Sequence, residues 1–278
     1  MKILAIVVTY YPQKDLLERN ITAFIDEVDK LLIWENTPEV RKKEFRYIDH
    51  PKVEYCGDGV NSISHALNYA WHVAVEGGYG YLLTMDQDSV FVNFNHFVES
   101  TVQNKQSPAG IWTPWFIDNP TQKNSCQQLF TEFLIGITSG MLQSVHIINK
   151  LGGWNESFFI DGVDTDYCLH GQRLGVKTYR VGGSYLIHRI GNPEKVSFRG
   201  RQTTVLNYSA RRYYSIFRTH VLLTRMYKEQ EEFKPMPFWL PQIKRIALLE
   251  KQGIKKLFYI LAGIVMGYLC RIPNRGIE

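Results

Sequence analysis

The chain has 278 residues, of which 45% are hydrophobic and 21% charged, and its formal net charge is +5. These proportions are ordinary for a globular protein and exclude a disordered chain. The mild positive charge leaves nucleic acid, phosphorylated small molecules and an anionic membrane surface open as partners. The four cysteines, Cys56, Cys126, Cys168 and Cys270, lack the paired spacing of a zinc site and suit a reducing compartment, so we expect a cytoplasmic protein.

Strands and helices alternate in the first half of the chain. Apolar and β-branched runs predict strands at 3–9, 30–36, 52–56, 79–85 and 109–115. Helical spacing of apolar residues predicts helices at 12–25 and 61–78, and a further one from 95 onward. This order predicts parallel strands joined by helical crossovers, hence an α/β protein whose ligands bind at the carboxyl ends of the strands.

The second half is less regular. One or two strands are expected within 128–143, with a turn at Ser139-Gly140, and a helix, a loop and a helix beginning near Asp164 within 144–175. A pair of short strands is expected at 176–191 and a long helix at 207–228. The proline-rich stretch 233–241 predicts a linker into a C-terminal extension.

The C-terminal extension carries an apolar run, Leu257 to Cys270, with lysines and an arginine at its ends. Spanning a bilayer takes about twenty residues, so this run is too short to cross one. It is expected to lie in a membrane interface or to pack on a core, and Gly263 and Gly267 suit close helix packing. The cluster Arg211-Arg212-Tyr213-Tyr214 is expected to hold an acceptor phosphate, to lie near the membrane or to form a solvated helix face.

Polar clusters follow three of the predicted strands. They are Thr9-Tyr10-Tyr11, Glu35-Asn36 and Asp86-Gln87-Asp88. Because the carboxyl ends of parallel strands meet at one edge of a sheet, we expect the three clusters to face one site. A local turn is the alternative for each cluster; it is a fair interpretation of Glu35-Asn36 taken alone and a poorer one of all three together.

The pair Asp86 and Asp88 points to a metal. Side chains two apart on an extended strand point the same way, so both carboxylates can reach one ligand. Two ionised carboxylates this close repel each other unless a cation neutralises them or one is protonated. Mg²⁺ or Mn²⁺, held by the two carboxylates and by substrate phosphates, fits best, and a solvated acidic turn is the alternative.

A second acidic group, Asp161, Asp164 and Asp166, stands where a helix is expected to begin. Helix capping is one interpretation. A general base is the other, because partial burial would raise the pKa of an aspartate from about 3.9 toward neutral. His188 closes a predicted strand, where it is either structural or completes an oxygen-rich metal site.

The order of these parts resembles a known family. The segments "IVVTYYP", "WENT", "NSISHALNYAW", "YLLTMDQDS", "GGWNESFFIDGVDTDYCLHGQRLG" and "LIHRIG" look like a family 2 glycosyltransferase of the GT-A fold, over about residues 1–225. The similarity is closest to the rhamnosyltransferase-like branch, which builds bacterial surface polysaccharides. That fold implies a mostly parallel central sheet with helices on both faces, followed here by a C-terminal helical extension.

Several residues take roles from this resemblance. On the donor side it implies Thr9 and Tyr10 at the nucleotide, Glu35 at the base or ribose, Asn61 at a polar position of the helix after the third strand, Asp86, Gln87 and Asp88 at the metal and diphosphate, and His188 completing that site. On the acceptor side it implies Asp164 as the catalytic base, with Trp154, Asp161 and Asp166 nearby. Val163 stands where the family has the first acid of a pair, so Asp161 and Asp166 compete for the role of base.

The implied enzyme is an inverting glycosyltransferase that depends on Mg²⁺ or Mn²⁺ and is peripheral on the inner face of the cell membrane. The leading donor is dTDP-rhamnose, and the acceptor is a hydroxyl of a surface polysaccharide or lipid-linked glycan. Residues 1–230 would form the catalytic domain, with 1–115 on the donor side and 116–230 on the acceptor side, and 231–278 the extension.

Two other functions compete. A nucleotidyltransferase acting on a sugar phosphate would need a glycine-rich phosphate loop, which "TYYPQKD" lacks. A nucleic-acid-binding protein is disfavoured because the arginines belong to no recognisable nucleic-acid module.

Overall fold

The computed structural model describes residues 2–37, 47, 49–117, 128–188, 194–198, 201–230, 233, 236–273 and 275. The chain forms two compact units, Met1–His188 and Arg189–Glu278. This division falls earlier than the domain boundary expected near residue 230. The functional domains 1–230 and 231–278 stay a prediction, because compactness alone does not test where an activity resides.

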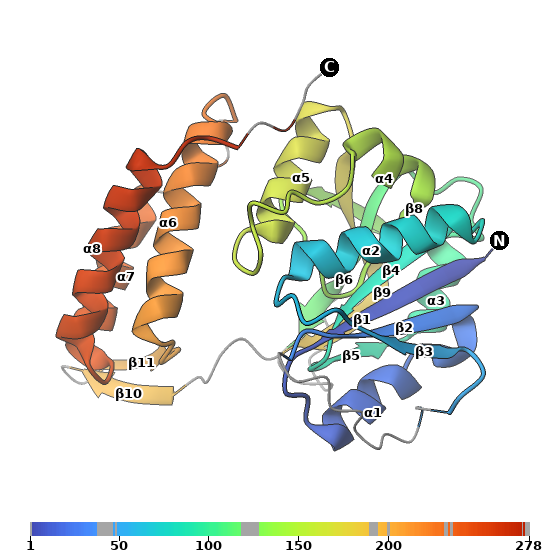
Figure 1. Ribbon diagram of the computed structural model, residues 1–278, viewed down its shortest axis with the longest axis horizontal. Helices are drawn as coiled ribbons and strands as arrows, with labels where there is room; N and C mark the ends of the chain where they lie inside the picture. Colours follow the sequence, from blue (N-terminus) through green and yellow to red (C-terminus); the bar gives the residue numbers. More distant parts are fainter. Residues whose placement is uncertain are drawn as a thin grey trace. The chain divides into compact units, whose positions relative to one another are not determined.

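The first unit is an α/β structure (Figure 1). Its elements are β1 Ile3–Thr9, α1 Lys14–Thr22, η1 Ile25–Glu27, β2 Lys30–Glu35, β3 Val53–Cys56, α2 Ile63–Glu76, β4 Tyr81–Asp86, β5 Ser89–Val92, α3 Phe94–Thr101, β6 Gly110–Ile117, β7 Phe130–Phe133, β8 Met141–Ser144, α4 Val145–Leu151, α5 Val163–Arg173 and β9 Lys177–His188.

The central sheet is mixed and mostly parallel, as predicted. Its strand order is β3-β2-β1-β4-β8-β6-β9-β5, and β7 pairs with β9 off this path. The pairings run β1, β2, β3, β4, β6 and β9 in one direction and β5, β7 and β8 in the other. The carboxyl ends of the four N-terminal parallel strands therefore lie along one edge.

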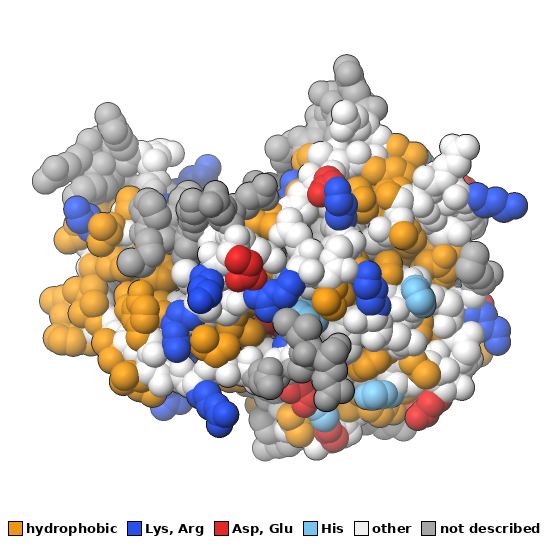
Figure 2. Space-filling model, turned by 90° about the horizontal axis from the view of Figure 1, so that it is seen from above, with side chains coloured by type: hydrophobic (Ala, Val, Ile, Leu, Met, Phe, Trp, Pro, Cys, Tyr) orange, Lys and Arg blue, Asp and Glu red, His pale blue; other side chains and the backbone are white. Residues whose placement is uncertain are grey.

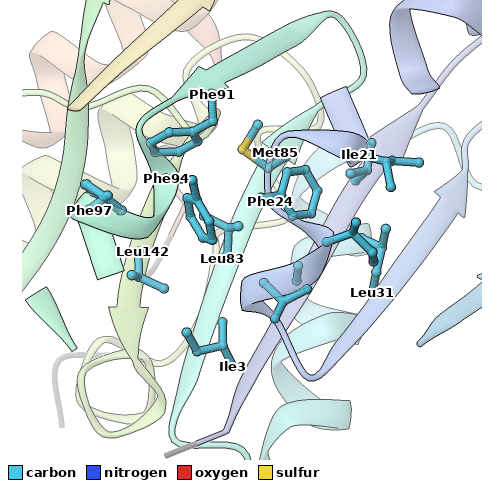
Figure 3. Close-up of a cluster of buried hydrophobic side chains, with 14 of the residues drawn as sticks. Ile3, Ile21, Phe24, Leu31, Leu83, Met85, Phe91, Phe94, Phe97 and Leu142 are labelled. Atoms are coloured by element: carbon cyan, nitrogen blue, oxygen red, sulfur yellow. The ribbon is translucent and has the colours of Figure 1, made fainter. Parts of the chain in front are cut away.

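Alternation along the strands creates two apolar faces. Odd-numbered residues of β1, such as Ala5 and Val7, enter a core with α1, η1 and α3. Figure 3 shows part of this core, with Phe94 of α3 beside Leu83 of β4. Even-numbered neighbours such as Leu4 are equally buried on the opposite face, where α2, α4 and α5 pack (Figure 1). The sheet is covered on both faces, which explains why its N-terminal strands read as continuous apolar runs.

Two strands differ from the sequence prediction. β5, directly after the Asp86-Gln87-Asp88 cluster, was not predicted, because four residues carry too little pattern. The expected pair of strands at 176–191 is wrong: the described part is one strand, β9, that bends without ending. Gly183 has a φ of +78°, and the register with β6 shifts between Pro114 and Trp115. A glycine adopts this backbone conformation without the penalty a side chain would bring, so the strand continues past the irregularity.

The second unit is a hairpin and three helices. These are β10 Glu194–Phe198, β11 Arg201–Val205, α6 Ala210–Met226, α7 Met236–Leu249 and α8 Gly253–Leu269. The linker expected at 233–241 is wrong from Met236 onward, since α7 begins there and contains Pro241. Pro237 lies in the first turn of that helix, where its missing N–H would have no helical partner.

Helices α6 and α8 pack closely through glycines, as the sequence indicated. A Cβ on Gly263 would stand 2.5 Å from the carbonyl oxygen of Tyr214, and one on Gly267 would stand 2.7 Å from that of Arg218. The glycines therefore bring the two backbones together. Among the described helices, none is long and apolar enough to cross a bilayer.

Candidate functional site

The three polar clusters meet at the carboxyl edge of the sheet. Thr9 of β1 pairs in register with Glu35 of β2, and Val8 pairs with Asp86 at the end of β4. The ends of β1, β2 and β4 are thus side by side, in the order that parallel crossovers dictate. The predicted convergence of the clusters on one edge is present in the structure.

Hydrogen bonds from three directions fix the Asp86-Gln87-Asp88 turn. Gln87 binds the backbone of Tyr10 twice: its Oε1 accepts from the Tyr10 N–H at 2.7 Å, and its Nε2 donates to the Tyr10 carbonyl at 3.0 Å. The side-chain amide of Asn20 donates to the Asp86 carbonyl. The Oγ of Ser139 accepts from the Asp86 N–H at 3.1 Å and donates to Ser89 Oγ at 2.8 Å.

The two carboxylates stand on a turn and not on a continuous strand. β4 ends at Asp86, Gln87 and Asp88 form the turn, and β5 begins at Ser89. Strand alternation therefore does not orient the pair, and the hydrogen bonds of the turn take over that role. Both aspartates are half-buried.

The pair suits a divalent cation. In the described ranges Asp88 has no lysine, arginine or hydrogen-bond donor on its carboxylate. No group of three or more His, Cys, Asp or Glu side chains gathers there as a metal site. Mg²⁺ and Mn²⁺ do not require such a group, because one or two carboxylates with substrate phosphates and water complete their coordination. Two half-buried carboxylates on a rigid turn fit that manner of binding.

His188 lies next to this turn along the sheet. It is the last residue of β9, and its register partner in β5 is Ser89, the residue after Asp88. The backbone therefore carries His188 to the same end of the sheet as the two aspartates. Its side chain falls outside the described residues, so its role at the metal and diphosphate stays a prediction.

The predicted nucleotide residues on β1 and β2 differ in exposure. Tyr10 is 45% exposed, whereas Thr9 and Glu35 are fully buried. The Glu35 carboxylate accepts from Tyr55 OH at 2.9 Å and from the N–H and hydroxyl of Thr37. Glu35 thus holds Thr37, two residues after it, by hydrogen bonds from the protein interior. Burial, together with the hydrogen bond to Glu35, raises the pKa of the Tyr55 hydroxyl.

Asn61 and Asp161 lie on segments that are hydrogen-bonded together. Asn61 is exposed and precedes Ser62, the N-cap of α2. Two residues further, the Ile63 N–H donates to the Phe159 carbonyl at 2.6 Å. His65, one turn into α2, lies between Asp58 and Glu156, 2.7 Å and 3.5 Å from their carboxylates. The loop that leads to α5 is therefore held at the start of α2.

The acidic residues before and in α5 have distinct environments. Asp161 and Asp164 are half-buried and Asp166 is fully buried. The capping interpretation is wrong, because Gly162 is the N-cap of α5 and no side chain caps the helix. Burial raises the pKa of Asp164 against the opposing hydrogen bonds from Thr165, and the charge of Asp161 raises it further.

A short series of contacts connects α5 to the turn at Asp86. Cys168, one turn after Asp164, lies at the Gly136 backbone, with 3.4 Å from the Gly136 nitrogen to its Sγ. Gly136 belongs to the segment before β8, which also contains Ser139, the partner of Asp86. α5 therefore packs over the segment that supports the aspartate turn. Burial raises the pKa of the Cys168 thiol to about 12, so this cysteine is a packing residue.

Trp154 is almost completely buried. Its ring stacks on Tyr167 of α5 with ring centroids 4.6 Å apart, and its backbone bonds both ways to the Asn68 side chain at 2.8 and 2.9 Å. The Trp154 indole N–H is buried and has no hydrogen-bond partner among the described residues. An acceptor-side role for Trp154 stays a prediction.

Sequence analysis missed Arg180. Its guanidinium carbon lies 4.3 Å from the ring centroid of Phe133 and 4.8 Å from that of Trp115. Its Nε is buried and has no hydrogen-bond partner in the part of the chain that the structure describes, and burial lowers the pKa of Arg180. Val181 packs in the core with α1 and α3, so alternation directs Arg180 to the opposite face, which α5 covers. The aromatics come from distant strands, so no local pattern could have revealed this cluster.

Comparison with solved structures shows the same architecture. GalNAc-T7, solved with UDP, GalNAc and Mn²⁺, aligns at a TM-score of 0.59 and 10% identity over 94% of this chain and 54% of its own. The chain has the GT-A fold. It thus spans about half the length of GalNAc-T7.

Two further solved structures and one protein sequence are similar to the chain. Staphylococcus aureus TarS 1-349 with UDP-GlcNAc matches at a TM-score of 0.54 and 11% identity over 98% of this chain and 82% of its own. The mannosyltransferase PcManGT of Pyrobaculum calidifontis, solved with GDP-Man and Mn²⁺, matches at a TM-score of 0.52 and 12% sequence identity. The match covers 97% of this chain and 76% of PcManGT. In sequence, dTDP-rhamnosyl transferase RfbF of Shigella flexneri is 26% identical over 242 residues, 80% of each protein. No protein-family model matches the chain.

The raised pKa of Asp164 predicts a pH-dependent stability difference. The folded state binds this proton more tightly than the unfolded chain, so the ionised carboxylate costs stability above the folded pKa. Replacing it in Asp164→Asn should stabilise the protein at neutral pH, and this gain should shrink as pH falls through the folded pKa toward about 3.9. Urea unfolding of both proteins at several pH values measures the difference. A gain that is constant with pH, or one that grows as pH falls, contradicts the assignment.

Proposed function

We propose that the protein is a glycosyltransferase that uses a nucleotide-diphosphate sugar. The supporting observation is the Asp86-Gln87-Asp88 turn, rigidly held at the carboxyl edge of a GT-A sheet beside the ends of β1 and β2. TarS and PcManGT were solved with a nucleotide sugar bound, and the name of RfbF contains dTDP-rhamnosyl. These three proteins support the same donor class here.

On the donor side, Asp86 and Asp88 would hold Mg²⁺ or Mn²⁺, with His188 as a further ligand. The metal supplies positive charge that stabilises the leaving diphosphate. Tyr10 and Asn61 are exposed where a nucleoside would lie, and the buried Thr9 and Glu35 shape the backbone beneath it. Gln87 keeps the Tyr10 backbone and the aspartate turn in register, so it positions both halves of the donor site.

On the acceptor side, Asp164 would accept the proton of the attacking hydroxyl. Its raised pKa makes the carboxylate a stronger base than a solvated aspartate. The hydroxyl oxygen bonds to the anomeric carbon as the bond to the diphosphate breaks, and a single displacement of this kind inverts that centre. Asp161 lies near enough to raise the pKa of Asp164, and Trp154 stacks on Tyr167 of the same helix. Asp161, Asp166 and Trp154 are the further residues proposed for the acceptor side.

The leading donor is dTDP-rhamnose, supported by the likeness to dTDP-rhamnosyl transferase RfbF across most of both chains. The acceptor would be a hydroxyl of a surface polysaccharide or of a lipid-linked glycan.

Replacement of the aspartates tests the reaction. Asp88→Asn should lower sugar transfer from dTDP-rhamnose by roughly 100-fold or more, because charge stabilisation of the leaving group is lost. Asp164→Asn should lower the turnover number by a similar factor while donor binding remains. Asp26→Asn, an exposed aspartate of η1, is the control. Nucleoside diphosphate release with each nucleotide sugar is the measurement.

Full activity of Asp88→Asn, or full activity in excess chelator, would contradict the metal role. Release of pyrophosphate in place of nucleoside diphosphate would identify a nucleotidyltransferase.

The protein would attach to the membrane through α8. One side of this helix packs on α6, whereas Ile254, Phe258, Leu261, Val265 and Leu269 form a stripe on the other side. Phe258 is 69% exposed and Leu269 72%. Figure 2 shows hydrophobic side chains gathered on this unit, at the left of the view, with basic residues beside them. An exposed apolar stripe with cations at its ends suits the interface of an anionic membrane. The protein would be peripheral there, and the expected place is the cytoplasmic face.

Vesicle binding tests this attachment. Phe258→Ser with Val265→Ser should weaken co-sedimentation with anionic vesicles by roughly tenfold or more, because both side chains lose their burial in lipid. Val75→Ser in α2, which removes a side chain 47% exposed, should have no effect. Equal binding by the unaltered chain, the double variant and Val75→Ser contradicts the proposal. So does a dimer in solution that the double substitution abolishes, since the stripe would then serve self-association.

A further inference from the structure

A basic pocket lies within the second unit, where helices α6 and α8 begin. Its volume is about 440 Å³. The first turn of α6 and the residues around the start of α8 line it, and four of the lining residues are the cations Arg211, Lys251, Lys255 and Lys256. Among the described residues that line it there is no aspartate or glutamate. A pocket of this composition has a strongly positive potential and favours an anion.

Three of the four cations are not neutralised by any residue that the structure describes. Lys256 is buried and donates to the Glu250 carboxylate at 2.7 Å, and Glu250 also accepts from Tyr213 at 2.6 Å. Arg211, Lys251 and Lys255 are exposed and form no ion pair or side-chain hydrogen bond with the part of the chain that the structure describes. Their charge is therefore available to a ligand.

Both helices add positive charge at this point. α6 and α8 each have 17 residues, and both begin at the pocket, at Ala210 and Gly253. The N-cap of α6 is Ser209, whose Oγ accepts from the Arg212 N–H at 3.2 Å. The N-cap of α8 is Gln252, which makes no side-chain cap hydrogen bond. The first N–H groups and the dipoles of two long helices are thus directed at the same cavity, an arrangement that binds phosphate well.

The exposed stripe of α8 begins beside the pocket. Ile254 and Phe258, 74% and 69% exposed, alternate along the helix with the pocket residues Lys255 and Tyr259. A ligand whose phosphate occupies the pocket would therefore have its apolar portion next to this stripe. That combination of groups is found in a lipid.

We propose that this pocket binds the phosphate of a membrane lipid, with the hydrocarbon part on the exposed stripe of α8. The phosphate can come from a phospholipid headgroup or from a lipid-linked glycan that serves as acceptor. The proposal rests on the membrane attachment through α8 and not on glycosyl transfer.

Vesicle binding with pocket variants tests the proposal. Arg211→Ala with Lys255→Ala should weaken binding to phosphatidylcholine vesicles containing phosphatidylglycerol by roughly 25-fold, from about fivefold for each lost cation. Lys244→Ala, which removes one exposed lysine of α7 that does not line the pocket, is the control, compared per charge removed, and should bind nearly as the unaltered chain does. Inorganic pyrophosphate should displace the unaltered chain and the control from these vesicles, and should not affect the residual binding of the double variant.

The lipid source follows from a second comparison. Stronger binding to vesicles with polyprenyl phosphate than with phosphatidylglycerol at equal content would assign the pocket to the acceptor, and the reverse to a headgroup; either result supports a lipid phosphate site. An equal loss for Lys244→Ala and the pocket variant, per charge removed, would overturn the proposal, because binding would then reflect net charge alone. If Phe258→Ser with Val265→Ser weakens vesicle binding, the comparison of the pocket variant with Lys244→Ala still tests the pocket, because Phe258 and Val265 do not line it.

Discussion

The candidate site depends on the hydrogen bonds that fix the turn between β4 and β5. Gln87 ties this turn to the backbone of Tyr10, and Asn20 and Ser139 hold it from α1 and from the segment before β8. These bonds keep the carboxylates of Asp86 and Asp88, two like charges, close together. Under the proposed function, the turn would be preorganised for a cation and a diphosphate.

The support of this turn extends to α5. Ser139 lies in the same segment as Gly136, and Gly136 contacts Cys168 of α5, one turn from Asp164. Because the segment before β8 touches both the aspartate turn and α5, a change in its packing would move the two groups of aspartates together. The loop before α5 is held separately, through the hydrogen bond between Ile63 and Phe159.

Sequence reasoning predicted what is local and periodic. β1, β2, β4 and α2 have unmistakable apolar patterns, and the rule on carboxyl ends was enough to place Asp86 beside the ends of β1 and β2. Non-local features escaped it. The bend at Gly183 made one strand look like two, and the prolines of α7 looked like a linker. Arg180 depends on Trp115 and Phe133, which come from two other strands.

If the proposed function holds, the Asp86-Gln87-Asp88 turn binds a divalent cation together with a nucleoside diphosphate. The most direct test is to titrate Mn²⁺ into the protein with and without dTDP and to follow free Mn²⁺ by its electron paramagnetic resonance signal. We expect dTDP to increase Mn²⁺ binding by the unaltered chain strongly, and Asp86→Asn with Asp88→Asn to abolish this increase. An increase of the same size in the double variant, or none in the unaltered chain with any nucleoside diphosphate, would contradict this expectation.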